Sequence, residues 1–192
     1  MPLTKFIVTE EVIAMVVLER LKVLIRGTCN LSRLKKNGLN VGENFHMLEG
    51  CIIDPGHCWL VSIGDHVTLA PRVQILAHDA STKMFLGYTK IGKVTIGNHV
   101  FIGAGTIILP NTRIADNTII GAGSVVTDDC KSGVYVGNPA RYICSLAEYL
   151  DKEKELMLHT CVYDREWTIG RITDERKDRM VKELDDQIGF VK

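Results

Sequence analysis

The stretch IGNHVFIGAGTIILPNTRIADNTIIGAGSVV, residues 96–126, decides the fold of this chain. An aliphatic residue returns at every sixth position, and a small or β-branched residue follows four places after each of them. An α-helix has a period of about 3.6 residues and a strand alternates from one residue to the next, so neither produces this spacing. The aliphatic positions are Ile96, Ile102, Ile108, Ile114, Ile120 and Val126, and the smaller ones are Val100, Thr106, Thr112, Thr118, Ser124 and Cys130.

This six-residue period predicts an all-β solenoid of parallel strands. Each unit supplies a short strand and a turn, three flat sides close a prism, and one coil uses about 18 residues. Small residues such as Gly97 at the corners let neighbouring coils approach closely. Weaker copies of the pattern reach back to Val41, so we expect about five or six coils. A sandwich of antiparallel strands would show irregular spacing and hairpin dipeptides such as Asn-Gly, which are absent from residues 39–143.

Helical patterns flank the repeat and suggest three parts. Residues 1–38 form an N-terminal helical segment, with Thr9 as the N-cap of a helix that reaches about Arg26. Residues 39–143 form the β-helix, and residues 144–192 form a C-terminal helical extension. The flanking helices are expected to cover the open ends of the solenoid.

Two helices are expected in the C-terminal extension. Ser145 and Glu148 have the spacing of a capping box, which predicts a helix to about His159. A further helix is expected over residues 173–187, ended by Gly189.

The composition excludes several classes of function. Lys and Arg together number 23, as do Asp and Glu, so no overall field attracts a nucleic acid or an anionic membrane. No apolar stretch reaches the roughly 20 residues of a membrane span, and the N-terminus lacks a signal-peptide pattern, so we expect a cytoplasmic protein. Six cysteines without a C-x-x-C pair are interpreted as reduced thiols rather than as disulfides or metal ligands.

The repeat breaks in two places, and these breaks are candidate functional segments. From Ile75 to Ile96 there are 21 residues, which six does not divide, so a loop over residues 78–90 leaves the prism. A second offset follows Ile53 and contains Asp-Pro-Gly-His-Cys-Trp, residues 54–59. Loops on a rigid scaffold often carry binding and catalytic groups.

The repeats, the Ala-His-Asp of residues 77–79 and the closing Gly-Asn-Pro-Ala-Arg of residues 137–141 resemble the hexapeptide-repeat O-acetyltransferase family. The resemblance covers about residues 41–143 and extends to galactoside, maltose, serine and polysaccharide O-acetyltransferases. It implies a left-handed parallel β-helix and a homotrimer with active sites between neighbouring prisms. It also implies acetyl-CoA as the co-substrate, no required metal, and a small acceptor hydroxyl, such as that of a sugar or polysaccharide precursor.

By this resemblance, His78 is the general base that takes the proton of the acceptor hydroxyl. Its unperturbed pKa of about 6.5 suits that role near neutral pH. Such a base needs a partner for its second ring nitrogen, and the sequence leaves Asp79, Glu49 and Asp54 open as that partner. Asp79 is the adjacent catalytic candidate.

Several residues are candidates for contact with the acceptor. Glu49 and Asp54 are among them because they come from the preceding coil. Trp59 and Tyr88 are expected there as loop residues, and His57, beside Trp59, is the other histidine of interest.

The resemblance also places the donor along the glycine-rich corners. The main chain at Ala104 is expected to meet the thioester and that at Ala122 the pantetheine arm, while Arg141 is expected beside the 3′-phosphate. Relatives often carry Thr-Lys where this chain has Thr127-Asp128, so one phosphate contact is missing unless Lys131 or a second subunit replaces it. The cofactor-binding candidates are Gly103, Ala104, Gly121, Ala122, Thr127, Pro139 and Arg141.

Three other functions are alternatives to acetyl transfer to a hydroxyl. The same cradle can serve N-acetylation of an amino sugar nucleotide, which is the main alternative. Carbonic anhydrases of the γ type bind zinc through three histidines, but the histidine spacings here lack their close pair. A non-catalytic β-helix subunit would not need the projecting loop, His78 and Arg141 together.

Overall fold

The computed structural model describes residues 30–192 and divides the chain into two compact units, with the boundary between Ile143 and Cys144. The helix expected between Thr9 and Arg26 lies outside the described residues. The described chain begins with the short helix α2 (Leu31–Lys36), where the Asn30 side chain accepts a hydrogen bond from the backbone N–H of Arg33.

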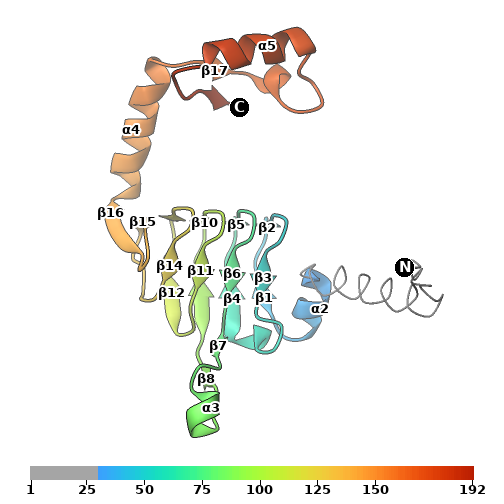
Figure 1. Cartoon of the computed structure of the whole chain (residues 1–192), viewed down its shortest axis with the longest axis vertical. Coiled ribbons are helices and arrows are strands. Elements are labelled where there is room, and N and C mark those ends of the chain that lie inside the picture. Colours follow the sequence, from blue (N-terminus) through green and yellow to red (C-terminus); the bar gives the residue numbers. More distant parts are fainter. Residues whose placement is uncertain (1–29) are drawn as a thin grey trace, which may run out of the picture. The chain divides into compact units, whose positions relative to one another are not determined.

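Three sheets, whose strands pair in parallel from coil to coil, form the faces of a prism (Figure 1). Up to β14, and apart from the hairpin of β7 and β8, consecutive strands of the chain fall on successive faces. Sheet A contains β1 (Asn40–Val41), β4 (Val61–Ile63), β9 (Val94–Ile96) and β12 (Thr112–Ile114). Sheet B contains β2 (His46–Met47), β5 (Thr68–Leu69), β10 (Phe101–Ile102), β13 (Thr118–Ile120), β15 (Gly133–Val136) and β16 (Arg141–Cys144). Sheet C contains β3 (Ile52–Ile53), β6 (Gln74–Ile75), β11 (Ile107–Ile108) and β14 (Val125–Val126).

The register of these sheets confirms the coil predicted from the period. Ile96 pairs with Ile114, and Ile102 with Ile120, so residues 18 apart in sequence lie side by side. The inward aliphatic side chains are at most 2% exposed, from Ile53 to Val126. Each such burial stabilises the fold by about 1.5–3 kcal/mol. The aliphatic ladder is therefore the core of the prism.

The small residues at the corners keep the coils close together, as predicted. A Cβ atom on Gly103 would lie 2.4 Å from the backbone nitrogen of Ala122 in the next coil. Similarly, a Cβ atom on Gly97 would lie 2.2 Å from a carboxylate oxygen of Asp116. A side chain at either position would collide with the neighbouring coil.

The long break in the repeat forms a hairpin that projects from the prism (Figure 1). Strand β7 (His78–Asp79) pairs antiparallel with β8 (Lys90–Ile91), and the short helix α3 (Lys83–Leu86) forms the tip. The shorter break forms the 3₁₀ turn η1 (Cys58–Leu60). Both breaks lie where the chain passes from sheet C to sheet A, a position called here the C–A corner.

The second unit combines helices with a pair of parallel strands. Helix α4 (Leu146–Leu158) starts with the expected capping box of Ser145 and Glu148. Strand β17 (Val162–Tyr163) pairs with β18 (Phe190–Val191), and the turn η2 (Arg165–Trp167) and helix α5 (Asp174–Glu183) lie between them in sequence.

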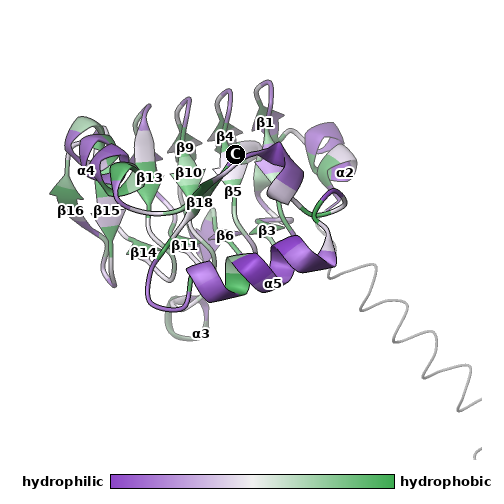
Figure 2. Ribbon diagram, turned by 90° about the horizontal axis from the view of Figure 1, so that it is seen from above, coloured by the Kyte–Doolittle hydropathy of each residue, from purple (hydrophilic) through white to green (hydrophobic). Residues whose placement is uncertain are grey.

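Helix α5 is shorter than the sequence predicts, because it ends at Glu183 instead of about Gln187. The side-chain amide of Gln187 donates to the backbone oxygen of Glu183, and the chain then turns into β18. Most of α5 is hydrophilic (Figure 2). In the described part of the chain, no helix is both long and apolar enough to span a membrane.

Candidate active site

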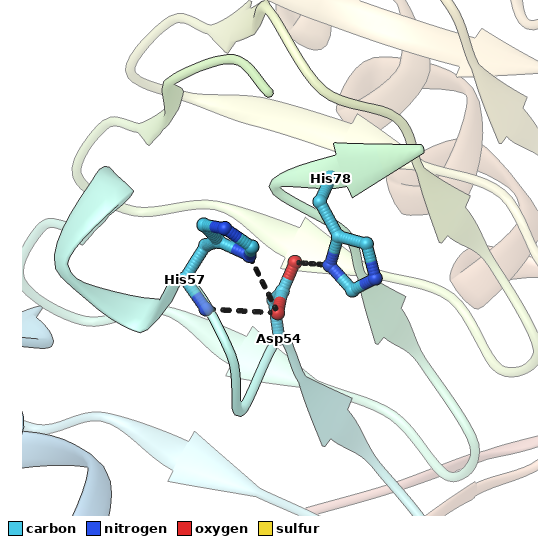
Figure 3. Close-up of side chains that lie close together, drawn as sticks. All are labelled: Asp54, His57 and His78. Atoms are coloured by element: carbon cyan, nitrogen blue, oxygen red, sulfur yellow. Dashed lines mark hydrogen bonds and ion pairs between the residues drawn. The ribbon is translucent and has the colours of Figure 1, made fainter. Parts of the chain in front are cut away.

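Asp54 is a buried carboxylate at the start of the C–A corner, directly after β3, and none of its surface is exposed. Its Oδ1 accepts hydrogen bonds of 3.0 Å from the backbone N–H groups of Gly56 and His57. Its Oδ2 faces the backbone nitrogen of Ala77 at 2.9 Å and Nδ1 of His78 at 2.5 Å. Asp54 thus connects the shorter break to the first residue of the projecting hairpin (Figure 3).

These contacts decide the charge of Asp54 and the tautomer of His78. Burial by itself would raise the pKa of Asp54, but the hydrogen bonds from His78, Ala77 and Gly56 outweigh it and leave the pKa below its ordinary value. The carboxylate is therefore ionised and can only accept. Nδ1 of His78 must donate to it, so the neutral imidazole has its lone pair on Nε2.

The exposure of His78 suits a proton-accepting group. Its side chain is 38% exposed, whereas Asp54 beneath it is fully buried. The carboxylate fixes the ring from the protein side and leaves the other side of the imidazole accessible. This is the arrangement of a histidine base held by an orienting carboxylate.

His57 is the third member of this cluster (Figure 3). Its ring centroid lies 5.1 Å from that of His78 and 5.3 Å from that of Trp59. Its Nδ1 lies 3.9 Å from Oδ1 of Asp54, which is too long for a hydrogen bond. Within the described part of the chain, this nitrogen is the one buried side-chain polar atom without a hydrogen-bond partner.

Asp79 has a different partner from the one that the sequence suggested for it. Its carboxylate lies 2.5 Å from Nζ of Lys90 on β8 and accepts a 2.8 Å hydrogen bond from the backbone N–H of Ser81. The contact with Lys90, followed by that with Ser81, lowers the pKa of Asp79 to about 2. Asp79 therefore joins the two strands of the hairpin, and Asp54 is the carboxylate that contacts His78.

The two aromatic residues expected to contact the acceptor, Trp59 and Tyr88, are both exposed. Trp59 is 57% exposed, and its ring lies beside His57. Tyr88 is 80% exposed on the hairpin, where its backbone oxygen accepts a hydrogen bond from Thr82. Of the two, Trp59 is the candidate whose ring lies beside a residue of the Asp54 cluster.

The small residues expected to contact acetyl-CoA lie at a different corner, together with the acceptor candidate Glu49. Glu49 and Ala104 line one open groove of about 530 Å³. Gly103, Gly121 and Ala122 belong to the same line of turns, where the chain passes from sheet B to sheet C, called here the B–C corner. Within one chain, the structure therefore does not bring Glu49 or the glycine-rich turns together with His78.

Arg141 is engaged with the residue that replaces the expected lysine. Its Nη1 lies 3.6 Å from Oδ2 of Asp128 and donates to the backbone oxygen of Ala140. The same Asp128 oxygen accepts a hydrogen bond from Thr127. Pro139 lies exposed between β15 and β16. These candidates share one end of the prism, and an anion at Arg141 would compete with Asp128.

The sequence did not indicate how closely the two breaks approach each other. Asp54 and His78 are 24 residues apart, and the backbone N–H of Ala77 that helps to hold the carboxylate has no sequence signature. The two breaks in the six-residue period were the signal, because both fall at the same corner of successive coils. Histidine spacing alone did not predict that His57 and His78 share one carboxylate.

Comparison with known proteins identifies the repeat. The family described as bacterial transferase hexapeptide (six repeats) matches residues 93–128. Galactoside O-acetyltransferase of Escherichia coli is 35% identical over 123 residues, which cover 62% of this chain and 58% of that protein. Protein CapG of Staphylococcus aureus is 36% identical over 135 residues, which cover 67% of this chain and 78% of that protein.

A solved structure gives the same result. Galactoside acetyltransferase in complex with coenzyme A matches with a TM-score of 0.53 and 32% identity, over 59% of this chain and 58% of that one. The chain thus spans a little over half the length of the galactoside acetyltransferases that it matches. Together with the prism and its six-residue ladder, these matches show that the chain belongs to the hexapeptide-repeat O-acetyltransferase family.

Proposed function

We propose that this protein transfers an acetyl group from acetyl-CoA to a hydroxyl of a small acceptor, with His78 as the general base. The observation that carries this proposal is the pairing of buried, ionised Asp54 with Nδ1 of His78, which leaves Nε2 free to accept a proton. Membership of the family supports acetyl-CoA as the donor and a left-handed turn of the coils.

The reaction follows from the tautomer of His78. Nε2 takes the proton of the acceptor hydroxyl as its oxygen attacks the thioester carbonyl carbon. The carbon–sulfur bond then breaks, and the imidazolium returns the proton to the leaving thiolate. Asp54 stabilises the transient imidazolium. General-base catalysis of this kind contributes about 10²–10⁴-fold to the rate.

The B–C corner offers a group that can stabilise the oxyanion. The backbone N–H of Ala104 donates no hydrogen bond to another described residue, and it lies on an exposed turn beside the groove with Glu49. A free, fixed backbone donor suits a developing negative charge on the thioester oxygen. On this basis we assign Ala104, and Ala122 at the same corner of the next coil, to the part of the site that binds acetyl-CoA.

A complete site then requires two copies of the chain. His78 lies at the C–A corner and Ala104 at the B–C corner, so one prism presents these groups on different edges. In a closed ring of three prisms, the C–A corner of each copy can face the B–C corner of the next. We therefore propose a homotrimer with the active sites between its subunits.

Mixed assemblies test this shared site. His78→Ala removes the base, and Ala104→Tyr fills the groove that receives the donor. Each variant alone should lose activity, but co-assembled chains should regain part of it, because some interfaces combine two intact halves. Mixtures that stay inactive although light scattering shows joint assembly near three times 21.4 kDa would contradict the shared site.

The acceptor is proposed to be a carbohydrate. The exposed face of Trp59, next to the Asp54 cluster, is a suitable surface for the apolar face of a sugar ring. Thiol release from acetyl-CoA should be measured with a panel of sugars, nucleotide sugars, amino sugars and amino acids. Acetylation of a sugar hydroxyl is the expected result, whereas transfer only to amines would replace it with the N-acetyltransferase alternative.

A further inference from the structure

Asp54, His57 and His78 bring three metal-binding donors to one point. One ligand atom from each residue lies within 4.8 Å of the others, and no other group of three such side chains does so in the described part of the chain. The carboxylate is fully buried and the two imidazoles are partly buried, which distinguishes this cluster from an exposed acidic patch.

The nitrogen of His57 is the second observation that indicates a ligand. Its Nδ1 is buried and makes no hydrogen bond. It faces Asp54, and the dashed line from the ring in Figure 3 marks this 3.9 Å contact. A buried nitrogen without a partner costs about 1–3 kcal/mol, so a structure that keeps one calls for an explanation. A cation held between this nitrogen and the carboxylate would satisfy it.

The donor set favours a particular class of ion. Two imidazoles and one carboxylate suit Zn²⁺ and neighbouring transition metals, whereas Mg²⁺ and Ca²⁺ prefer oxygen donors. Tetrahedral Zn²⁺ places its donors about 3.4 Å apart at bond lengths of about 2.0–2.2 Å. His57 Nδ1 lies 3.9 Å from the nearer carboxylate oxygen, and His78 Nδ1 lies 2.5 Å from the other. Shifts of about 1 Å or less for these pairs therefore bring them to that spacing.

We infer that Asp54, His57 and His78 form a binding site for Zn²⁺ or a similar transition-metal ion, and that this ion competes with the catalytic state of His78. The ion takes the place of the hydrogen on Nδ1 of His78 and lies between this nitrogen, Nδ1 of His57 and the carboxylate of Asp54. The hydrogen bonds from Ala77, Gly56 and His57 keep the carboxylate in place in both states.

Occupancy changes the tautomer of His78 without a net change in protons. With the lone pair of Nδ1 bound to the ion, the single proton of the neutral ring resides on Nε2. Nε2 then has no lone pair with which to accept the proton of a hydroxyl. This consequence, inhibition by the metal, rests on the proposed function, whereas the binding itself does not.

The chain offers a matched control for adventitious binding. His66 and His99 form a stacked, exposed pair elsewhere on the prism, with ring centroids 4.8 Å apart and an interplanar angle of 6°. Neither contacts a carboxylate in a buried position. His57→Phe and His99→Phe therefore remove one histidine each from the proposed site and from a surface pair.

The test is a titration of the tag-free full chain with Zn²⁺ in a calorimeter and with Co²⁺ followed by visible absorption. The parent and His99→Phe should bind one ion per chain at this site and give the absorption bands of tetrahedral Co²⁺. His57→Phe should bind at least about 100-fold more weakly, because it lacks a direct ligand. His57→Asn serves as a second variant if thermal unfolding shows that the Phe variant does not fold.

Each remaining outcome decides the inference. Three results would overturn the site. The parent could fail to bind the ion, both folded His57 variants could bind it as tightly as the parent, or His99→Phe could lose binding. Acetyl transfer is then measured with chelator and with Zn²⁺ for each variant against its own chelated rate. If the rate of acetyl transfer is the same with and without bound Zn²⁺, the proposed inhibition is overturned but the binding site is not. If the protein binds the metal but shows no acetyl transfer under any condition, the binding site stands and the result counts against the proposed function.

Discussion

At the scale of single residues, Asp54 is the side chain of the proposed site that holds several of its parts together by hydrogen bonds. It closes the turn at Gly56 and His57, holds the start of the hairpin at Ala77 and fixes the tautomer of His78. Asp79, although adjacent to His78, is bound to Lys90. Successive side chains of a strand point to opposite sides, so Asp79 points away from the side of β7 on which His78 meets Asp54.

Asp54→Asn and Asp79→Asn should distinguish the contributions of these two carboxylates to catalysis. The amide presents N–H donors where Ala77 and His78 already donate, so kcat should fall by about 10³–10⁴-fold through loss of the correct tautomer. The folded state should lose about 1–3 kcal/mol. Asp79→Asn is the matched control and should lower kcat by less than about tenfold. Steady-state kinetics of both variants decide the point, and equal losses would contradict the role given to Asp54.

Acidification should reveal the charge of Asp54. Its pKa in the folded protein lies below the ordinary value of 3.8, so its ionised form stabilises the fold above that pH. The contribution is lost as the pH falls through the lower, folded-state pKa. The gap in unfolding free energy between the parent and Asp54→Asn should therefore be full at about pH 6 and shrink below about pH 4. Urea unfolding of both proteins across this pH range measures the difference in unfolding free energy. A difference that does not change with pH would contradict an ionised Asp54 with a lowered pKa.

At the scale of the elements, the six-residue ladder decides stability. Ile120 on β13 points into the prism and is fully buried, whereas its neighbour Ile119 points outward and is only partly buried. The sequence predicted this alternation because every inward position repeats in register with the next coil. It could not predict the end of α5, where a side chain of the following loop and the strand β18 replace the last helical turn.

Ile120→Ala should thus destabilise the prism far more than Ile119→Ala. The buried position loses its transfer free energy and leaves a cavity, at a cost of about 2–5 kcal/mol. The outward position loses less than half of that. Chemical denaturation of both variants compares them directly, and similar midpoints would show that the two side chains do not face opposite ways.

At the scale of the whole molecule, the six-residue period predicted the prism, and its two breaks indicated the C–A corner, where Asp54 and His78 meet. What the sequence could not provide was the distance between corners. The resemblance assigned His78 and Ala104 to one site, and the sequence added Glu49 as a residue of the coil before His78. The order of strands places His78 on a different edge from the other two. The homotrimer proposed above would bring the two edges together, because each site would combine corners of two copies.

The role of His78 in acetyl transfer is tested most directly by thiol release from acetyl-CoA in the presence of the best acceptor, compared between the parent and His78→Ala. Light scattering on the same samples establishes that both have the same assembly. The account predicts a loss of about 10²–10⁴-fold in kcat with unchanged mass. Equal rates in two identically assembled proteins would contradict it.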